Sequence, residues 1–363
     1  MSLSQLKTNC RFFRGDVPCR PHKESGVHCF DEKGDVCEFF DEVKENILII
    51  KLGAIGDVIR TTPLFARLKK EHPQAKFYWL TNTPVVVPKE VDSVLRYDFK
   101  SVEILRGIPF DVSINLDKDI DACSIHSQIN SKEKLGFTLT NGIISPADEK
   151  AEHKFFTGIF DDLNKANKKN YLEEIFEIAG LNYEGEKYVL DTFDAFAESW
   201  EIDKSKKVVG LNAGCGGRWT SRLWPEAYWI ELAKSLKAKD YEVVLLGGEL
   251  EHEKNLRIAQ AANAKYFGHF RLETFISLVN KCDLVVTAVT MAMHITLALN
   301  KKIILFNNIF NKNEFELFGL GEILEPSKEC KCFFSPKCVN EEYRCMEHLE
   351  PSRVLTAIKS LLQ

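Results

Sequence analysis

The sequence lacks any apolar run close to the roughly 20 residues that a membrane-spanning helix needs. Its longest apolar runs, such as Ile47–Ile50 and Val243–Leu246, have the length of a strand. Met1–Gly15 has no apolar stretch of the kind found in secretory signals, so we expect a protein of the cytoplasm. Basic residues are not in excess either, because 48 Lys and Arg stand against 53 Asp and Glu. The resulting net charge of -5 argues against non-specific nucleic-acid binding.

The composition excludes a largely disordered chain, because 45% of the residues are hydrophobic. A length of 363 residues exceeds what one hydrophobic core usually serves, so two domains are expected. The G-x-G-x-x-G fingerprint of dinucleotide-binding folds is absent, and Thr81-Asn82 ends the expected second strand where such folds carry an acid. These absences argue against a simple dehydrogenase.

Eight of the eleven cysteines gather near the two ends of the sequence: Cys10, Cys19, Cys29 and Cys37 in one set, and Cys330, Cys332, Cys338 and Cys345 in the other. In a reducing compartment, clusters of four favour thiolate metal sites over disulfides, with zinc or iron as the ion. The C-terminal set is compact, whereas the N-terminal set is spread wider, has no CxxC pair and adds His22 and His28 as further candidates. One or two structural metal ions are therefore expected, in separate sites or in one pooled site. Free, partly buried thiols are the alternative.

Strand-length apolar runs and helical stripes alternate from residue 44 onward. We expect strands at Asn46–Lys51, Phe77–Thr81, Asp111–Leu116, Lys207–Asn212, Tyr241–Leu246, Leu284–Thr287 and Lys302–Phe306. Helices are expected at Val58–Lys70, Tyr171–Ala179, Pro225–Ala238, Leu272–Asn280 and Ala292–Leu299. This alternation predicts an α/β protein with two Rossmann-like, doubly wound domains, 44–190 and 191–363, separated by a cleft and preceded by a Cys-rich extension, 1–43.

A glycine-rich turn, Gly53–Asp57, follows the first expected strand and ends in an acid. Asp57 stands at the start of a helix, where a carboxylate commonly caps the backbone or interacts with the helix dipole. It could instead face the cleft as the general base for an acceptor hydroxyl. The motif by itself favours the cap.

The segment Asn212–Pro225 offers several groups that bind anions. Its small residues let backbone amides approach a ligand, and Arg218 and Arg222 add positive charge. Thr220 and Ser221 add hydroxyls, so the segment favours a diphosphate site over a mobile surface loop.

Two further strand ends carry polar side chains. Acids in Gly247–Glu253 could bind ribose hydroxyls, although stabilising the start of the next helix is an equal alternative. Thr290 and His294 are four residues apart at a second helix start and could share one face near a phosphate. A lone histidine near a helix is more often structural, so this second motif is weak by itself.

Taken together, these motifs resemble glycosyltransferase family nine, the ADP-heptose:lipopolysaccharide heptosyltransferases. The resemblance runs from about Ile47 to Leu362, and its most specific parts are Ile47–Leu64, Arg222–Trp229, Gly247-Gly248 with Glu251–Glu253, and Met293-His294 with Ala298-Leu299. It implies the GT-B fold, with the donor in the C-terminal domain and the acceptor mainly in the N-terminal one. It also implies an inverting enzyme with no organic cofactor and no catalytic divalent metal. Asp117-Lys-Asp119 matches the D-x-D motif with which other glycosyltransferases bind a metal, but a metal-free mechanism argues against that role here.

The resemblance assigns roles position by position. Asp57 matches the general base, Arg222 a diphosphate-binding position that is commonly lysine, and Glu253 the acid that contacts the ribose. The expected donor site therefore comprises Asn212, Gly214, Thr220, Ser221, Arg222, Glu253, Thr290, Met291 and His294. The expected acceptor side comprises Arg60, Asp117 and Asp119.

One motif departs from the family. The family usually reads D-S-G-x-M-H or D-T-G-x-x-H before the last helix, and here Val289 and Met291 replace the Asp and the Gly. Valine cannot bond a sugar hydroxyl, so the donor sugar differs or is held otherwise. Together with the segment Asn307–Phe315 and the clustered cysteines, the sequence Val289–His294 is similar to that of the family branch that heptosylates autotransporter proteins. Members of that branch carry a thiolate-bound iron.

The resemblance implies an ADP-sugar donor and either a lipopolysaccharide-type glycan or a protein hydroxyl as acceptor. Peripheral association with the inner membrane and oligomer formation are both left open. Three alternatives also stay open: a transferase using another nucleotide-sugar, a non-catalytic nucleotide-sugar-binding protein, and a metal-responsive protein on the same fold.

Overall fold

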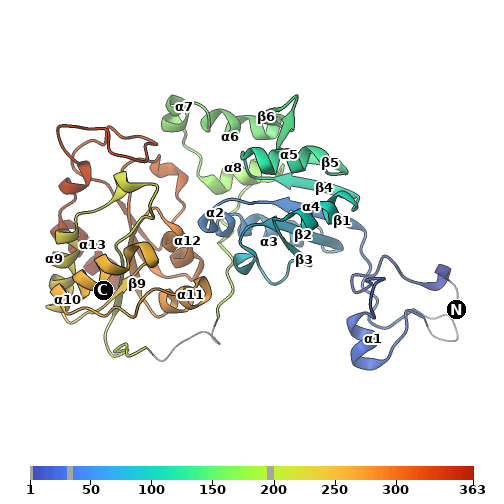
Figure 1. Cartoon of the computed structure of the whole chain (residues 1–363), viewed down its shortest axis with the longest axis horizontal. Coiled ribbons are helices and arrows are strands. Elements are labelled where there is room, and N and C mark those ends of the chain that lie inside the picture. Colours follow the sequence, from blue (N-terminus) through green and yellow to red (C-terminus); the bar gives the residue numbers. More distant parts are fainter. Residues whose placement is uncertain (1–2, 31–35, 194–199) are drawn as a thin grey trace. The chain divides into compact units, whose positions relative to one another are not determined.

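The computed structural model describes residues 3–30, 36–193 and 200–363. It divides into two compact units that interleave along the chain (Figure 1). The first unit contains residues 1–52, 65–84 and 89–149, and the second contains residues 53–64, 85–88 and 150–363. The predicted segmentation into 1–43, 44–190 and 191–363 stays a prediction.

The first unit is built on a six-stranded sheet with the order β3-β2-β1-β4-β5-β6. Its strands are β1 Glu45–Ile50, β2 Ala75–Thr81, β3 Ser93–Arg96, β4 Phe110–Asn115, β5 Ser131–Thr140 and β6 Ile143–Pro146. All neighbours are parallel except β5 and β6, and Ile47 of β1 lies opposite Phe77 and Val112. Helices α4 Phe99–Arg106 and α5 Ile120–Gln128 connect its later strands. The order 3-2-1-4-5 is that of a Rossmann sheet, whose strand order reverses beside β1.

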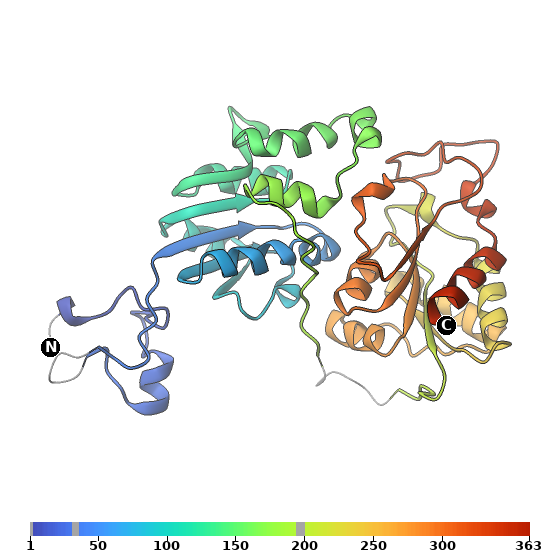
Figure 2. The same ribbon diagram turned by 180° about the vertical axis from the view of Figure 1, so that it is seen from behind.

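The second unit is built on a five-stranded, fully parallel sheet with the order β11-β10-β9-β7-β8. Its strands are β7 Val208–Asn212, β8 Glu242–Leu246, β9 Leu284–Ala288, β10 Lys302–Phe306 and β11 Gly321–Leu324. Helices α9 Glu226–Lys237, α10 His252–Ala262 and α13 Pro351–Leu362 cover one face, and α11 Leu272–Asn280 and α12 Met291–Ala298 cover the other (Figures 1 and 2). The chain winds outward from β7 in both directions, as in other doubly wound folds.

These sheets confirm the predicted α/β class and every strand expected from the sequence, with ends shifted by one or two residues. Most of the predicted strands are buried apolar runs, and all residues of β7, β8 and β9 are buried. Helices cover both faces of the second sheet, which explains why its strands read as continuous hydrophobic stretches. The elements missed by the sequence include β3, β5, β6 and β11, which are edge or less buried strands with a weaker pattern.

The single helix expected at Val58–Lys70 is wrong, because the chain forms two helices there, α2 Ile55–Ile59 and α3 Thr62–Glu71. The hydroxyl of Thr61 donates to the carbonyl of Val58, and the hydroxyl of Thr62 donates to that of Ile59, each at 2.7 Å. Such side-chain bonds compete with the helical ladder, and Pro63 removes an amide donor as well. Helix α2 belongs to the second unit, whereas α3 from Phe65 onward belongs to the first.

The remaining helices of the second unit, α6 Glu152–Thr157, α7 Asp161–Ala166 and α8 Tyr171–Ile178, follow one another before the second sheet begins. In residues 3–30 and 36–43 of the N-terminal segment, the helices are the short η1 Leu3–Gln5 and α1 Arg20–Ser25. No helix in the described ranges is both long and apolar enough to cross a membrane.

Candidate functional site

A cavity of about 710 Å³ opens at the carboxyl end of the second sheet. It lies where the strand order reverses between β7 and β9, the place at which open α/β sheets bind ligands. All of its lining residues belong to the second unit. They come from α2, the loops after β7 and β8, α11, the start of α12, and the segment around Phe310–Phe315.

The floor of the cavity is a small polar cluster at the ends of β7 and β9. Asn212 Nδ2 donates to the hydroxyls of Thr287 at 2.9 Å and Thr290 at 3.3 Å. Thr290 precedes the first turn of α12, so this cluster fixes the end of the helix that presents free backbone amides. The structure brings six of the predicted donor-site residues together in the lining of the cavity: Asn212, Gly214, Arg222, Thr290, Met291 and His294.

Asp57 reaches the same cavity from α2. Its Oδ1 lies 2.8 Å from Nη2 of Arg60, one turn along the chain. The guanidinium of Arg60 also lies 3.5 Å from the centroid of the Tyr171 ring. Burial opposes the charged form of Arg60, but the charge of Asp57 raises its pKa above the ordinary value. The predicted base and the predicted acceptor-side arginine therefore form one ion pair at the cavity wall.

His294 lies behind Asp57 in the wall of the cavity and is 5% exposed. Burial and, to a smaller extent, the nearby charge of Arg60 together lower its pKa to about 3, against an opposing effect of Asp57. The ring is therefore neutral at physiological pH. Its Nδ1 is buried and has no hydrogen-bond partner within the described part of the chain.

Arg222 lines the cavity but is 7% exposed and already engaged with the backbone. Nη1 donates to the Val289 carbonyl, and Nη2 donates to the Cys215 carbonyl at 3.3 Å. Burial lowers its pKa, and Cys215 partly offsets that effect. Its guanidinium thus joins the loop after β7 to the loop after β9. Its role at a diphosphate stays a prediction, with only Nε left without a partner among the described residues.

Thr220 and Ser221 are not among the residues that line the cavity. Their hydroxyls donate to the carbonyls of Pro336 at 3.4 Å and Ser335 at 2.6 Å. The structure therefore uses this part of the predicted donor loop to hold the C-terminal cysteine segment, and their phosphate contacts stay a prediction.

Glu251, and not Glu253, is the acid of the Gly247–Glu253 segment that lines the cavity. Its carboxylate accepts hydrogen bonds from the amides of Gly248 at 3.1 Å and Gly216 at 3.4 Å. A Cβ on Gly214 would lie 2.2 Å from Glu251, so this glycine is required for the approach of the loop. Glu253 is exposed in the first turn of α10. The sequence did not single out Glu251 because three acids alternate in this segment, and only the position at which the helix begins decides which of them faces the cavity.

Asp117 lies in the first unit, where β1 and β4 end side by side. It is buried, and its carboxylate accepts from Lys51 Nζ and from the Leu52 amide. Asp119 is exposed and directly precedes α5. The two carboxylates do not face a common point as the ligands of a D-x-D metal site would, because Asp117 is buried at the carboxyl end of the sheet and Asp119 is exposed to solvent. Its acceptor role stays a prediction.

Aromatic side chains that the sequence analysis did not select form another wall. Trp219 packs edge-on against Phe310 and Phe334, with ring centroids 5.6 and 5.7 Å apart. All three line the cavity, and the Arg222 guanidinium lies 5.4 Å from the Phe310 ring. Trp219 is more than 90 residues from both phenylalanines in sequence, so no local pattern could have joined the three.

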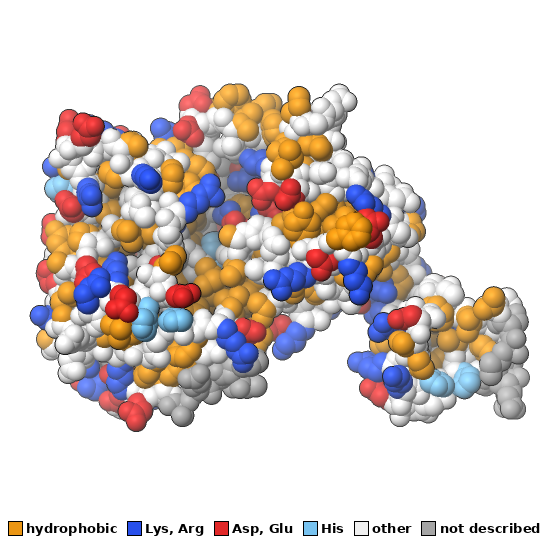
Figure 3. All heavy atoms as spheres, in the orientation of Figure 1, with side chains coloured by type: hydrophobic (Ala, Val, Ile, Leu, Met, Phe, Trp, Pro, Cys, Tyr) orange, Lys and Arg blue, Asp and Glu red, His pale blue; other side chains and the backbone are white. Residues whose placement is uncertain are grey.

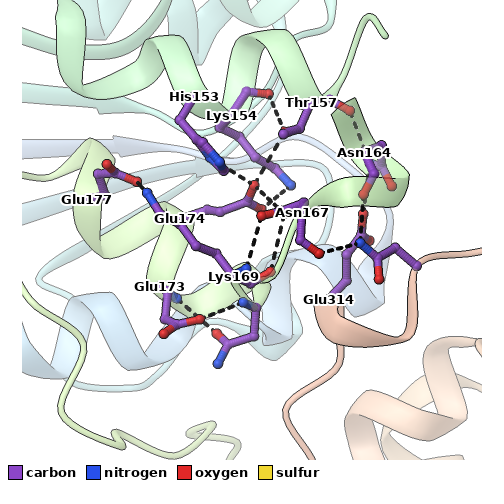
Figure 4. A network of polar contacts seen from close by, with 12 residues as sticks. His153, Lys154, Thr157, Asn164, Asn167, Lys169, Glu173, Glu174, Glu177 and Glu314 are labelled. Carbon is purple, nitrogen blue, oxygen red and sulfur yellow. Dashed lines mark hydrogen bonds and ion pairs between the residues drawn. The ribbon is translucent and has the colours of Figure 1, made fainter. Parts of the chain in front are cut away.

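Glu314 also lines the cavity and was not selected from the sequence. Its Oε1 accepts from Asn164 Nδ2 at 3.1 Å, and Asn311 Nδ2 donates to the carbonyls of Asn164 and Asn167 (Figure 4). The fully buried carboxylate of Glu174 anchors this network through three donors, Lys154, Thr157 and Asn167, and His153 Nδ1 lies 3.5 Å from it. The network fixes the segment that carries Glu314 to helices α6–α8.

The four C-terminal cysteines form two contacting pairs. The Sγ atoms of Cys332 and Cys338 are 3.6 Å apart, and Asn308 Nδ2 lies 3.7 and 3.4 Å from the sulfurs of Cys330 and Cys345. A hydrogen bond from Cys330 lowers the pKa of Cys345 to about 6. All eleven cysteines are free thiols, and no three His, Cys, Asp or Glu side chains of the described residues form a ready-made metal site.

Comparison with known proteins gives the family. The sequence model of glycosyltransferase family 9 (heptosyltransferase) matches residues 102–309. Lipopolysaccharide heptosyltransferase 2 of Salmonella typhimurium is 27% identical over 128 residues, which are 33% of this chain and 35% of the relative. The chain thus matches about a third of the length of that relative.

Solved structures share the fold. The ADP-heptose lipopolysaccharide heptosyltransferase II of Escherichia coli superimposes with a TM-score of 0.65 and 18% identity, over 87% of this chain and 98% of that one. The iron-containing, dodecameric glycosyltransferase TibC of enterotoxigenic E. coli gives a TM-score of 0.55 and 13% identity, over 88% and 76%. TibC has also been solved with ADP-D-β-D-heptose. Because the family model covers more than half of the sequence, this chain belongs to glycosyltransferase family 9, the heptosyltransferase family.

Proposed function

We propose that this chain transfers a heptose from ADP-heptose to an acceptor hydroxyl, with inversion at the anomeric carbon. One observation carries the proposal: Asp57 lines the same cavity as the glycine-rich loop after β7 and the first turn of α12. A carboxylate and groups suited to a diphosphate thus share one space. The names of the relatives support the donor, since they include an ADP-heptose transferase and a complex with ADP-heptose.

The diphosphate of the donor would lie against the loop amides near Gly214–Gly216 and the first turn of α12. Both offer backbone N–H groups at the carboxyl end of the sheet, where an anion is favoured. His294 and Arg222 line the cavity beside these amides and would contribute further contacts to the donor. The acid that binds the ribose would be Glu251 in place of the expected Glu253, because Glu251 faces the cavity.

Asp57 would act as the general base. Its carboxylate accepts the proton of the acceptor hydroxyl while the new C–O bond forms, and the bond between the anomeric carbon and the diphosphate breaks. The electron pair of the broken bond leaves with ADP, and the amides and the α12 terminus stabilise that negative charge. Arg60 would orient the carboxylate through their ion pair and its contact with Tyr171.

The donor sugar needs polar contacts that Val289 cannot supply, because its side chain is apolar and its carbonyl accepts from Arg222. Glu314 is a lining residue of the right chemistry that has no other role in the proposed site, and its carboxylate is held in place by Asn164. We therefore assign the sugar hydroxyls to Glu314. The acceptor is a hydroxyl of a lipopolysaccharide-type glycan or of a protein.

The C-terminal cysteines fit a thiolate-bound metal ion. Cys332 touches Cys338, Asn308 reaches both Cys330 and Cys345, and soft thiolates suit iron or zinc. The iron of TibC supports this assignment. The ion would be structural: Ser221 and Thr220 hold the segment from Ser335 to Pro336, next to the lining residue Phe334.

The test is calorimetric binding of ADP, UDP and GDP, followed by turnover of the matching sugar conjugates. Tight ADP binding with release of ADP from ADP-heptose in the presence of acceptor supports the proposal. Preference for another base would assign a different donor, and nucleotide binding without any turnover would assign a sensor. No nucleotide binding at all would favour a metal-responsive protein.

A further inference from the structure

The N-terminal segment, residues 3–43, has almost no hydrophobic core. Pro21 is the one fully buried residue among those described in it, and its longest helix, α1, has six residues. Hydrophobic and histidine side chains lie at its surface (Figure 3), and Val17, Val36 and Phe39 are each more than 40% exposed. So small a segment usually needs a crosslink or a metal to keep one structure.

All four cysteines of this segment line one cavity of about 30 Å³. Two isolated bridges fold the segment back on itself: Phe30 pairs with Val36, which sets Cys29 beside Cys37, and Cys10 pairs with Glu42. The Cys37 amide donates to the Cys29 carbonyl at 3.2 Å. The other lining residues are mainly apolar: Lys7, Phe12, Phe13, Pro21, Val27, His28, Phe39 and Phe40. Thiols 27 residues apart in sequence therefore converge on one point.

The surroundings suit thiolates. The Phe39 amide donates to Cys37 Sγ at 3.4 Å, and Lys7 brings a positive charge to the cavity wall. No carboxylate lines the cavity within the described residues, so a bound cation would have sulfur as its main ligand. Sulfur ligands select thiophilic ions over magnesium or calcium.

We propose that Cys10, Cys19, Cys29 and Cys37 bind one thiophilic divalent metal ion, Zn²⁺ or Fe²⁺, in a structural site. A volume of about 30 Å³ is near the space of a single water molecule, which fits one ion and is too small for an iron–sulfur cluster. Because no described trio of ligand side chains is already in place, the thiols must close around the ion as it binds. Binding is thereby coupled to the folding of the segment.

The site would fasten the segment to the first sheet. Arg11, next to Cys10, pairs with Asp41 and with Asp92, each at 2.8 Å, and donates to the Ala75 carbonyl at the start of β2. Asp92 in turn accepts from the Phe77 amide. An ion that holds Cys10 in place therefore holds the arginine that bonds the segment to β2. This inference is independent of the proposed transferase activity.

The experiment is metal analysis of the purified full-length chain by inductively coupled plasma mass spectrometry. We compare wild type with Cys19→Ser/Cys29→Ser, with Cys330→Ser/Cys332→Ser, and with Cys282→Ala as the control for loss of a buried thiol. The N-terminal double variant should lose one equivalent of metal relative to wild type, with or without the C-terminal substitutions. Cys282→Ala should lose none.

X-ray absorption at the metal edge of the Cys330→Ser/Cys332→Ser protein gives a second measurement that does not depend on how the N-terminal variant folds. Four sulfur neighbours at about 2.3 Å would support the proposal. Unchanged metal content in the N-terminal variant would overturn it. So would a disulfide between any two of the four cysteines in the protein as purified, because oxidised sulfurs do not bind the ion as thiolates.

Discussion

Gly56 of α2 lies directly against the imidazole of His294 on α12: a Cβ at position 56 would be 2.5 Å from Cδ2 of the ring. This contact lets the helix that carries Asp57 approach the helix whose first turn lines the cavity. The glycine is thus required by packing and not by backbone conformation, since its φ is negative like that of an ordinary helical residue.

Gly56→Ala should destabilise the protein by about 1–3 kcal/mol, because the added methyl overpacks a buried ring. Transfer should fall more than the loss of folded protein explains, since Asp57 shifts with α2. Chemical denaturation and initial rates measure both effects. Gly107→Ala is the control, because its nearest contact would be an ordinary 3.5 Å; equal effects in the two variants would contradict the packing argument.

Asp57→Asn should lower kcat by about 10²–10⁴-fold, the usual contribution of a general base. The affinity for ADP should change less than about 2-fold, since the nucleotide contacts are on other loops. Steady-state rates and calorimetry separate the two quantities. A variant that keeps nearly the wild-type rate would rule out Asp57 as the base.

Glu251→Gln should weaken ADP binding about 10-fold, because a charged hydrogen bond to the ribose contributes about 1.5 kcal/mol or more. Glu253→Gln is the matched control and should change the affinity less than about 2-fold, since that acid is exposed outside the cavity. Calorimetric titration with ADP distinguishes them. The reverse order would restore Glu253 as the ribose ligand.

His294 should make stability fall in mild acid. Its folded pKa is about 3, below the unfolded value near 6.5, so the unfolded chain binds the extra proton between these limits. The contribution of the neutral His294 ring to the free energy of unfolding is therefore fully present above pH 6.5. Below that pH, the free energy of unfolding should decline by about 1.4 kcal/mol per pH unit. Denaturation of wild type and His294→Gln at pH 7 and pH 5 should show a difference in pH dependence of about 2 kcal/mol. Parallel pH dependences would mean that the ring protonates readily in the folded protein.

Asp117→Asn should cost about 3–5 kcal/mol of stability, because it leaves the buried Lys51 ammonium without its carboxylate. Asp119→Asn should cost less than about 0.5 kcal/mol, since that side chain is exposed. Urea denaturation of the two variants makes the comparison. Similar losses would show that the Asp117–Lys51 pair does not stabilise the first sheet.

The sequence by itself determined the α/β class and the strands, because continuous buried apolar runs such as Val243–Leu246 need helices on both faces of a sheet. It also selected Asp57, Asn212, Thr290 and His294, because each lies at the end of a strand or near the start of a helix, and such positions can be recognised from the local sequence.

Only the tertiary structure decided which neighbouring acid faces the cavity. Glu251 and Glu253 are indistinguishable by pattern, and the start of α10 turns one inward and the other to solvent. The same holds for Trp219, Phe310 and Glu314, which meet through packing across long stretches of sequence. The N-terminal cysteines likewise share one cavity although they are far apart in sequence. Two isolated β-bridges, which no sequence pattern indicates, fold this segment back on itself. Local chemistry is encoded in residue order, whereas convergence depends on contacts that only the folded chain makes.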